Sequence, residues 1–497
     1  MIDTTHSQPG SQHYHKGVVA LLFILIVLAF AVQGPKWATA DEPAFIYTTD
    51  EIIVRLQPGI DVDGVNADFG TITLRTLPYS EDIYLLQTAP GADALALAAA
   101  MNGDGRFQYA EPNFRNAAPE ATGVDTYGWG VDTYGWGIDT YGWGVDTYGW
   151  GVDTYGWGED ARSSGIDTYG WPTDDPNNGS RFNPRSLYNW AAAPKDLSHY
   201  FNQPAIHQVH LENNAPTGAG ITVAILDTGI DAAHPLLAPY LSSVRYDFVD
   251  NDPLPNDEFN GLDDDGDGFI DEIAGHGTHI AGIVHLVAPQ ARIMPLRVLD
   301  SDGQGDSFVI AEAMLYAAQH GATVINMSLG TVWPSTFLQD VVQQVTAQGV
   351  LVVAAAGNLG TDIAQYPAAA DCALGVTAVG PGMQKTDFAS YGTWVDLAAP
   401  GDRVYSTYPG GYSWWQGTSM ATPFVSGQAA LLRGVNPALT PADLAQIIAG
   451  TAQPVDAANQ EYDGLLGYGR IDIHSSLALL AAGNWMSMPN PLQACNQ

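Results

Sequence analysis

The sequence predicts an α/β fold in which helices cover both faces of a parallel sheet. Three apolar runs have the length of buried strands, at residues 222–226, 324–327 and 350–355. A helical stretch at residues 310–320, which ends at Gly321, lies between the first and second runs. Strands that alternate with helices along a chain are typical of a parallel sheet buried on both faces.

Asp227 directly follows the first of these strands. Open α/β sheets carry their active sites at the carboxyl ends of their strands, so the position favours a functional carboxylate. The triplet at residues 227–229, Asp-Thr-Gly, also marks aspartic proteases. Those enzymes need two carboxylates that share a proton, and no second DTG or DSG triplet occurs here. Taken alone, Asp227 is equally well explained as a turn residue after a strand.

Two histidines, His276 and His279, precede an apolar run that predicts a buried helix with His276 in its first turn. Histidines at this spacing can bind a metal, but the HExxH motif and its glutamate are absent. We therefore expect one histidine to be a working base and the other to be a packed, hydrogen-bonded neighbour.

Ser419 lies in the string Gly-Thr-Ser-Met-Ala-Thr-Pro at residues 417–423. Gly417 permits a sharp turn, and the residues up to Gly434 predict a helix that begins at Ser419. Pro423 is expected to lie in the first turn and to fix where the helix begins, because an interior proline breaks the hydrogen-bond ladder. The serine hydroxyl would then lie at the helix mouth, within reach of a base. A simple N-cap serine is the alternative.

Asn358 follows the third strand. An acyl transfer passes through a tetrahedral oxyanion, which a fixed amide N–H stabilises. The order Asp, His, Ser along the chain is one of the few that serine hydrolases use. The motifs together therefore predict a serine hydrolase with Asn358 as the oxyanion donor.

These motifs resemble those of the subtilisin-like serine proteases, the subtilase family. The resemblance runs from about residue 218 to 480 and includes further strings at residues 288–289, 296–299, 324–330, 366–367, 399–401 and 467–470. It implies a doubly wound, subtilisin-like α/β catalytic domain. It also implies that Asp227 orients the imidazole, that His276 is the general base, and that Ser419 is the nucleophile.

The resemblance further implies a pocket for the side chain before the cut, with residues 328–330 as one wall and residues 354–357 as the other. Gln365 is expected near its floor. The substrate-binding residues expected are Ser328, Leu329, Gly330, Ala355, Gly357 and Gln365. Subtilases bind their substrate as an added strand, so we expect polypeptide substrates and broad selectivity.

Residues 1–40 are expected to be a secretory signal peptide. Lys16 precedes an apolar run at residues 18–32, and Ala-Thr-Ala at residues 38–40 offers a cleavage site. A retained anchor would need a run of nearer 20 residues. The protein is therefore expected to be secreted, free or attached to the cell surface, and to contact the membrane only through the signal peptide.

Residues 41–117 read as a small α+β domain in front of the catalytic domain. Strands are expected at residues 51–56, 72–75, 82–86 and 107–113, and a helix at residues 92–101. The string Tyr-Ala-Glu-Pro-Asn, which ends at Asn113, resembles the end of subtilase propeptides. Such propeptides template folding and inhibit their enzyme by placing their tail in the substrate groove. An unrelated α+β module is the alternative.

Residues 118–171 form an unusual Gly/Trp repeat linker. Seven heptads run from Gly123 to Trp171, and six of the 13 tryptophans of the chain lie in them. Two glycines in each repeat unit exclude a coiled coil. A spacer and a docking platform of aromatic faces both stay open, and we favour docking because a spacer has no need of aromatic residues.

An acidic segment before His276 predicts a calcium site. Its oxygen ligands alternate and Gly268 stands at the sixth position, as in the first half of an EF-hand loop. The twelfth position is Ala274, so the closing carboxylate is missing and Asp271 or Glu272 is expected to replace it. A solvated acidic loop is the alternative. The expected ligands are Asp263, Asp265, Asp267 and Asp271.

The net charge is −37, from 54 acidic and 17 basic residues, which excludes a nucleic-acid-binding footprint and favours a monomer. Cys372 and Cys495 either form one bridge or stay as two thiols. The catalytic domain is expected at residues 172–484, followed by a tail at residues 485–497. We predict an exported serine endopeptidase made as a propeptide-inhibited zymogen. The alternative is a cell-surface binding or structural protein that uses the heptads and carries an inhibited or inert protease domain.

Overall fold

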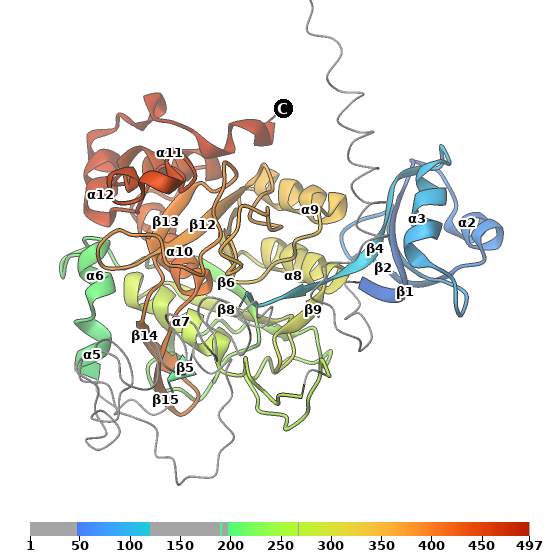
Figure 1. The fold of residues 1–497 in the computed structure, drawn as a ribbon, viewed down its shortest axis with the longest axis horizontal. Coiled ribbons are helices and arrows are strands. Elements are labelled where there is room, and N and C mark those ends of the chain that lie inside the picture. The colour runs from blue at the N-terminus through green and yellow to red at the C-terminus, as the bar shows by residue number, and fades with distance from the viewer. Residues whose placement is uncertain (1–46, 120–188, 191–196, 267, 497) are drawn as a thin grey trace, which may run out of the picture. The chain divides into compact units, whose positions relative to one another are not determined.

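The computed structural model describes residues 47–119, 189–190, 197–266 and 268–496 (Figure 1). The expected signal peptide, the heptad repeats and Asp267 lie outside the described residues. No helix in the part of the chain that is described is long and apolar enough to cross a membrane.

A seven-stranded parallel sheet forms the centre of the C-terminal α/β domain. Its strand order is β13-β12-β11-β10-β6-β8-β7, and every neighbouring pair is parallel. The three strands expected from the sequence are β6, β10 and β11, each within one residue of the expected bounds. The strands are β6 (Thr222–Asp227), β7 (Tyr246–Asp247), β8 (Arg292–Arg297), β10 (Val324–Met327), β11 (Leu351–Ala355), β12 (Ala373–Val379) and β13 (Leu397–Pro400).

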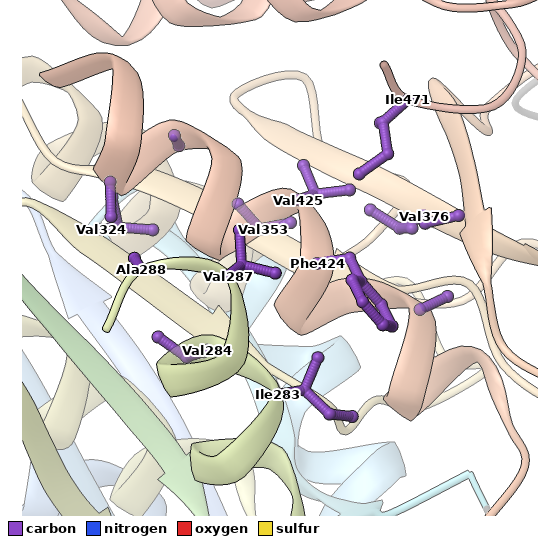
Figure 2. Close-up of a cluster of buried hydrophobic side chains, with 14 of the residues drawn as sticks. Ile283, Val284, Val287, Ala288, Val324, Val353, Val376, Phe424, Val425 and Ile471 are labelled. Carbon is purple, nitrogen blue, oxygen red and sulfur yellow. The ribbon is translucent and has the colours of Figure 1, made fainter. Parts of the chain in front are cut away.

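Helices cover both faces of this sheet, which confirms the predicted fold class. Alternate residues of β6 belong to different cores: Val223 and Ile225 pack with one set of helices, and Ala224 and Leu226 with the other. The first core is shown in Figure 2, where side chains of α7 and α10 meet the strands. The helices on that side are α7 (His276–Val287), α10 (Thr418–Val435) and α11 (Pro441–Thr451), and those on the other are α8 (Ser307–Gln319) and α9 (Thr336–Ala347).

The strand order reverses between β6 and β10. From β6 the chain runs to β7 and β8 on one side, and it later builds β10 to β13 on the other. Connections that leave in opposite directions open a crevice at the carboxyl ends of the two strands. Asp227 ends β6 and Ser328 follows β10, so both lie at this crevice.

The N-terminal module comprises residues 47–119, with an antiparallel sheet in the order β2-β3-β1-β4. All expected strands and the expected helix are confirmed. The helix α2 was not predicted, because it is short and its apolar stripe consists of only three residues, Val62, Val65 and Phe69, of which Val65 alone is buried. The elements are β1 (Tyr47–Leu56), α2 (Val62–Phe69), β2 (Ile72–Thr76), β3 (Ile83–Gln87), α3 (Ala94–Asn102) and β4 (Phe107–Ala117).

The sheet of the N-terminal module has two buried faces. One face, with Ile52 and Val54, forms a core with α3. The other, with Ile53 and Tyr109, joins the core that contains α8 and α9. The end of β4 also pairs with β9 (Gln304–Asp306), which belongs to the α/β domain.

The remaining elements lie at the periphery of the α/β domain. Cys372 and Cys495 form a disulfide, which settles the alternative left open by the sequence and ties the C-terminal segment to the start of β12. A small antiparallel sheet contains β14 (Val404–Tyr408), β15 (Gly411–Trp415) and β5 (Asn189–Trp190). The other helices are α5 (Leu197–Phe201), α6 (Pro204–Gln208), α12 (Ile473–Ala482) and short 3₁₀ turns at Ala238–Tyr240, Asp456–Ala458, Gln460–Tyr462, Trp485–Ser487 and Pro491–Asn496.

Candidate active site

A buried carboxylate and a buried imidazole meet at the crevice. His276 is the first residue of α7, and its Nδ1–H donates to Asp227 Oδ1 over 2.6 Å. Neither side chain is more than 1% exposed. The backbones of the two segments are in contact, since a Cβ atom at Gly277 would lie 2.2 Å from the carbonyl oxygen of Gly229. With Nδ1 committed to Asp227, Nε2 is the ring nitrogen that can accept a proton from a nucleophile.

His279 lies one turn further along α7 as a packed neighbour. Its Nε2 is 3.2 Å from the carbonyl oxygen of Ser413, and its ring stacks on Trp415 at 5.6 Å. Burial, and then the charge of His276, lowers the pKa of His279 to about 3. His279 is therefore neutral at physiological pH. Trp415 also contacts the ring of His276, with ring centroids 5.4 Å apart.

Ser419 lies in the first turn of α10, which begins at Thr418. The expectation that Pro423 marks the first turn was wrong, because Pro423 lies inside the helix. Proline has no N–H to donate to the carbonyl four residues earlier, which is that of Ser419. This carbonyl instead accepts a hydrogen bond of 2.9 Å from the hydroxyl of Ser328. The proline thus leaves a backbone group of Ser419 available to bind the segment that follows β10.

Asn358 is held beside Ser419 by the neighbouring threonine. Its Oδ1 accepts from the backbone N–H of Thr418 at 2.9 Å and from the hydroxyl at 3.0 Å. An N–H can only donate, so this contact fixes which end of the amide is oxygen and directs the NH₂ group elsewhere. Thr418 was not singled out from the sequence, although its place directly before Ser419 is a signal that points to it.

The expected substrate-binding residues lie on two segments near Ser419. Ser328, Leu329 and Gly330 follow β10, and Ala355 and Gly357 lie at the end of β11 and just beyond it. All five are buried. Gln365 contacts the second segment, because a Cβ at Gly357 would come within 2.1 Å of the Gln365 amide. A Cβ at Gly330 would be 3.8 Å from Gln365 Oε1. The Gln365 side chain therefore reaches both segments.

The end of β4 lies between β9 and the segment that follows β10. Asn116 pairs with Gly305 of β9, and the N–H of Ala118 donates to Gly303 over 2.9 Å. On the other side, Ala117 and Gly330 exchange N–H···O=C bonds of 3.0 and 2.9 Å. The pairing is antiparallel, so residue 119 comes opposite Ser328, the residue that binds the carbonyl of Ser419. This tail therefore approaches Ser419 as an added strand.

Polar side chains of the N-terminal module also contact α8 and α9. Glu111, which is 8% exposed, accepts hydrogen bonds from the Ser335 hydroxyl and from the N–H groups of Thr336 and Phe337. These are first-turn groups of α9, so Glu111 caps that helix. Asn113 accepts similarly from the N–H of Phe308 in α8 at 3.1 Å.

Three carboxylates gather at the loop before His276, two from the loop and one from the segment before β9. They are Asp263, Asp265 and Asp302, and their ligand atoms lie within 4.8 Å of one another. Asp302 is fully buried, and no N–H or alcohol hydroxyl of the described residues donates to its Oδ1. Asp271 is not among these three, and its two oxygens accept hydrogen bonds from the backbone N–H groups of Asn260 and Gly261.

Asp302 was missed from the sequence. It lies 39 residues beyond Asp263, and only the folding of the loop against the segment before β9 brings it to the cluster. Apart from the Asp-Ser-Asp string at residues 300–302, no local signal marked it.

The comparisons with known proteins agree with this architecture. A model of the subtilase family matches residues 218–469, and a model of the fervidolysin N-terminal prodomain matches residues 35–113. Thermitase from Thermoactinomyces vulgaris is 42% identical over 226 residues, which are 43% of this chain and 75% of thermitase. Subtilisin BL from Lederbergia lenta is 37% identical over 275 residues, 53% of this chain and 93% of that protein.

Among solved structures, fervidolysin from Fervidobacterium pennivorans has a similar fold. The TM-score is 0.62 at 20% sequence identity, and the match covers 88% of this chain and 62% of the fervidolysin chain. At this identity the likeness concerns the fold alone.

Proposed function

The chain belongs to the subtilase family and is a serine protease made with an N-terminal prodomain, and we propose that Asp227, His276 and Ser419 carry out its reaction. Ser419 Oγ attacks the peptide carbonyl while His276 Nε2 takes its proton. Asp227 holds Nδ1–H and stabilises the imidazolium. The amide NH₂ of Asn358 donates to the oxyanion. His276 then protonates the leaving amine, and water hydrolyses the acyl-enzyme.

The observation that carries this proposal is the buried 2.6 Å contact between His276 and Asp227. It fixes the tautomer that leaves Nε2 to act as a base, and it lies at the same crevice as the segment that binds Ser419. Casein hydrolysis by the wild type and by Ser419→Ala tests it. The variant should be folded and inactive.

Polypeptides are the substrates, and we propose that they bind in the place the prodomain tail takes in this structure. A chain that pairs with β9 and Gly330 is held by its backbone, so most sequences fit. The side chain before the cut would lie between the segments that contain Ser328 and Gly357, with Gln365 against both. We expect broad selectivity.

We propose that the prodomain is both an inhibitor and a folding template. Its tail occupies the strand position of a substrate, and its sheet completes the apolar core on α8 and α9. Ion pairs add to the contact, as Arg55 lies 2.6 Å from Asp340 of α9. The hydroxyl of Tyr109 donates to the same carboxylate over 3.0 Å.

The stabilising contact of Glu111 should depend on pH. Burial raises the pKa of Glu111 from 4.5 to about 7, against the hydrogen bonds from Ser335, Phe337 and Thr336. The folded chain therefore binds a proton that the unfolded chain has already lost between pH 4.5 and 7. The contribution of Glu111 to the free energy of unfolding should thus fall by about 3 kcal/mol as pH rises through this window.

Urea unfolding of the full chain in a Ser419→Ala background measures this effect, since self-digestion is then absent. Glu111→Gln should flatten the dependence on pH between 4.5 and 7. The exposed Glu81, in the same module, provides the control variant Glu81→Gln, which should keep the pH dependence of the parent chain. Equal pH dependence in both variants would contradict the assignment.

We propose that the carboxylates Asp263, Asp265 and Asp302 bind a structural calcium ion. Calcium prefers oxygen ligands, and a buried carboxylate oxygen such as Asp302 Oδ1 fits that demand. The ion would join the loop before His276 to the segment that leads into β9. The chemistry it supplies is charge neutralisation, and no catalytic step passes through it.

Removal of calcium with a chelator should lower the Tm by about 5–10 °C, because a ligand at 100 times its Kd adds about 2.7 kcal/mol to stability. Asp302→Asn should have a low Tm that the chelator no longer changes. A differential scanning calorimetry series, with calcium added back, checks this. A wild-type Tm that is the same with and without chelator would exclude the site.

We propose that the protein is exported and acts as a secreted monomer. The support is the apolar run with its Ala-Thr-Ala string at residues 38–40, together with the strongly negative net charge. The aromatic heptads would belong to the exported protein.

A further inference from the structure

Asp257 is a buried carboxylate beside the proposed catalytic residues that the mechanism above does not use. It is 7% exposed. Its Oδ1 accepts from the Thr228 hydroxyl at 3.0 Å and from the Gly275 N–H at 2.7 Å. Its Oδ2 accepts from the N–H and the hydroxyl of Thr278 at 2.9 and 2.6 Å. Burial raises the pKa of Asp257, and the hydrogen bonds from Thr278 and Gly275 oppose that rise.

The two hydroxyl groups are arranged to donate to Asp257. The Thr228 hydroxyl accepts from the N–H of Gly277 at 3.0 Å, and the Thr278 hydroxyl accepts from the N–H of Asp231 at 2.8 Å. Each hydroxyl has one proton, and in this arrangement that proton points to Asp257. All four contacts therefore bring a proton to the carboxyl group, which is the pattern that an ionised carboxylate requires.

The donors come from the two segments that carry the acid and the base. Thr228 directly follows Asp227, and the other donors flank His276 at the start of α7. The N-cap position of α7 is a glycine, which has no side chain to cap the helix. Asp257 supplies the missing cap from a distant part of the chain, and it binds both segments at once.

We propose that Asp257 is a positioning residue for the peptidase reaction. Its carboxylate holds Asp227 and His276 in place relative to each other, through Thr228 and the first turn of α7. The inference rests on the proposed function, because it assumes that His276 is the base. It adds a second ionised carboxylate that acts on the imidazole through hydrogen bonds rather than by touching it.

The charge of Asp257 also affects the proton affinity of His276. The amino end of a helix carries a partial positive charge, which disfavours an imidazolium, and a carboxylate at that end offsets it. The titratable groups that face His276 are Asp227 from β6 and His279 from α7, and β15 presents the uncharged Trp415. Loss of the Asp257 charge should therefore lower the pKa of His276. Since the base must be neutral to act, the acid limb of the kcat/KM profile should move to lower pH.

The test compares Asp257→Asn with Asp472→Asn in the enzyme matured from the full-length chain. Asp472 is a matched control because it is also buried and caps a helix, α12, away from the crevice. Hydrolysis of a chromogenic peptide is measured from pH 5 to 10, with thermal unfolding followed by circular dichroism. Asp257→Asn should lower kcat about 10–100-fold with KM within about twofold, since misplaced groups lose rate rather than binding. Its acid limb should shift down by about half a unit.

Asp472→Asn should lower the Tm and leave both kcat and the acid limb unchanged. A second variant, Thr228→Val, keeps the shape of the side chain and removes the hydroxyl that links Asp257 to Gly277. It should give a smaller loss of kcat than Asp257→Asn, and it provides the test if Asp257→Asn does not fold. Wild-type kcat and an unshifted acid limb in folded Asp257→Asn, or wild-type kcat in Thr228→Val, would overturn the inference. An inactive wild type would instead refute the proposed function itself.

Discussion

Replacement of Ser419 with alanine should abolish peptidase activity, with a fall in kcat of about 10⁶-fold, the magnitude known for the nucleophile of subtilisin. The variant loses the only atom that forms the acyl-enzyme bond in the proposed mechanism. The packing of α10 should survive, because Ser419 contacts Ser328 through its backbone carbonyl, which alanine keeps. Casein and a chromogenic peptide measure the activity, and circular dichroism checks the fold.

The control for this variant is Ser476→Ala. Ser476 is also buried, on α12, where its hydroxyl donates to the carbonyl oxygen of Ile473 over 2.9 Å, away from the crevice. It should cost some stability and keep activity. The Ser419→Ala chain should also stay intact, whereas the wild type should cut itself on the carboxyl side of the prodomain. Mass spectrometry distinguishes the intact chain from the cleaved one. A Ser419→Ala chain that processes itself would contradict the assignment of Ser419 as the nucleophile.

Removal of the side-chain amide of Asn358 should lower kcat about 10²–10³-fold and leave KM nearly unchanged, a magnitude taken from the equivalent experiment on subtilisin. The oxyanion forms only on the way to the acyl-enzyme, so its donor contributes to the transition state and not to substrate binding. Steady-state kinetics of Asn358→Ala on a chromogenic peptide measure the two constants separately.

The variant Asn358→Asp distinguishes donation of a hydrogen bond to the oxyanion from the hydrogen bonds that Asn358 accepts from Thr418. Aspartate keeps an oxygen that accepts from the N–H and hydroxyl of Thr418, but it replaces the NH₂ group with a negative oxygen. Its kcat should fall at least as far as that of Asn358→Ala. If it were within about threefold of the wild type, the role of Asn358 would be structural support of Thr418 and not donation to the oxyanion.

The parts of the site that were predictable from the sequence are those that local strings encode. An apolar strand followed by Asp227, and a helix that begins at His276, each follow from a few adjacent residues. The order of strands in a parallel sheet then brings strand ends together, and the structure joins these two residues by a hydrogen bond.

What the sequence did not reveal depends on contacts between distant segments. Asp302 completes the acidic cluster only after the loop folds against the approach to β9, and the expected ligand Asp271 is used by two local N–H groups instead. Pro423 looked like a helix start, because nothing in its own neighbourhood shows that Ser328 binds the carbonyl it leaves open. Such pairings require the tertiary register, which no single segment contains.

The cap that Glu111 places on α9 has a consequence for the lifetime of the processed enzyme. When the prodomain departs, the N–H groups of Thr336 and Phe337 lose a carboxylate partner, although Ser335 still caps Leu338. The processed enzyme therefore lacks the contribution that this cap makes to the stability of its precursor. Its lifetime in a medium rich in proteases would then depend on its rate of unfolding. Molecules that unfold would be digested before they could refold.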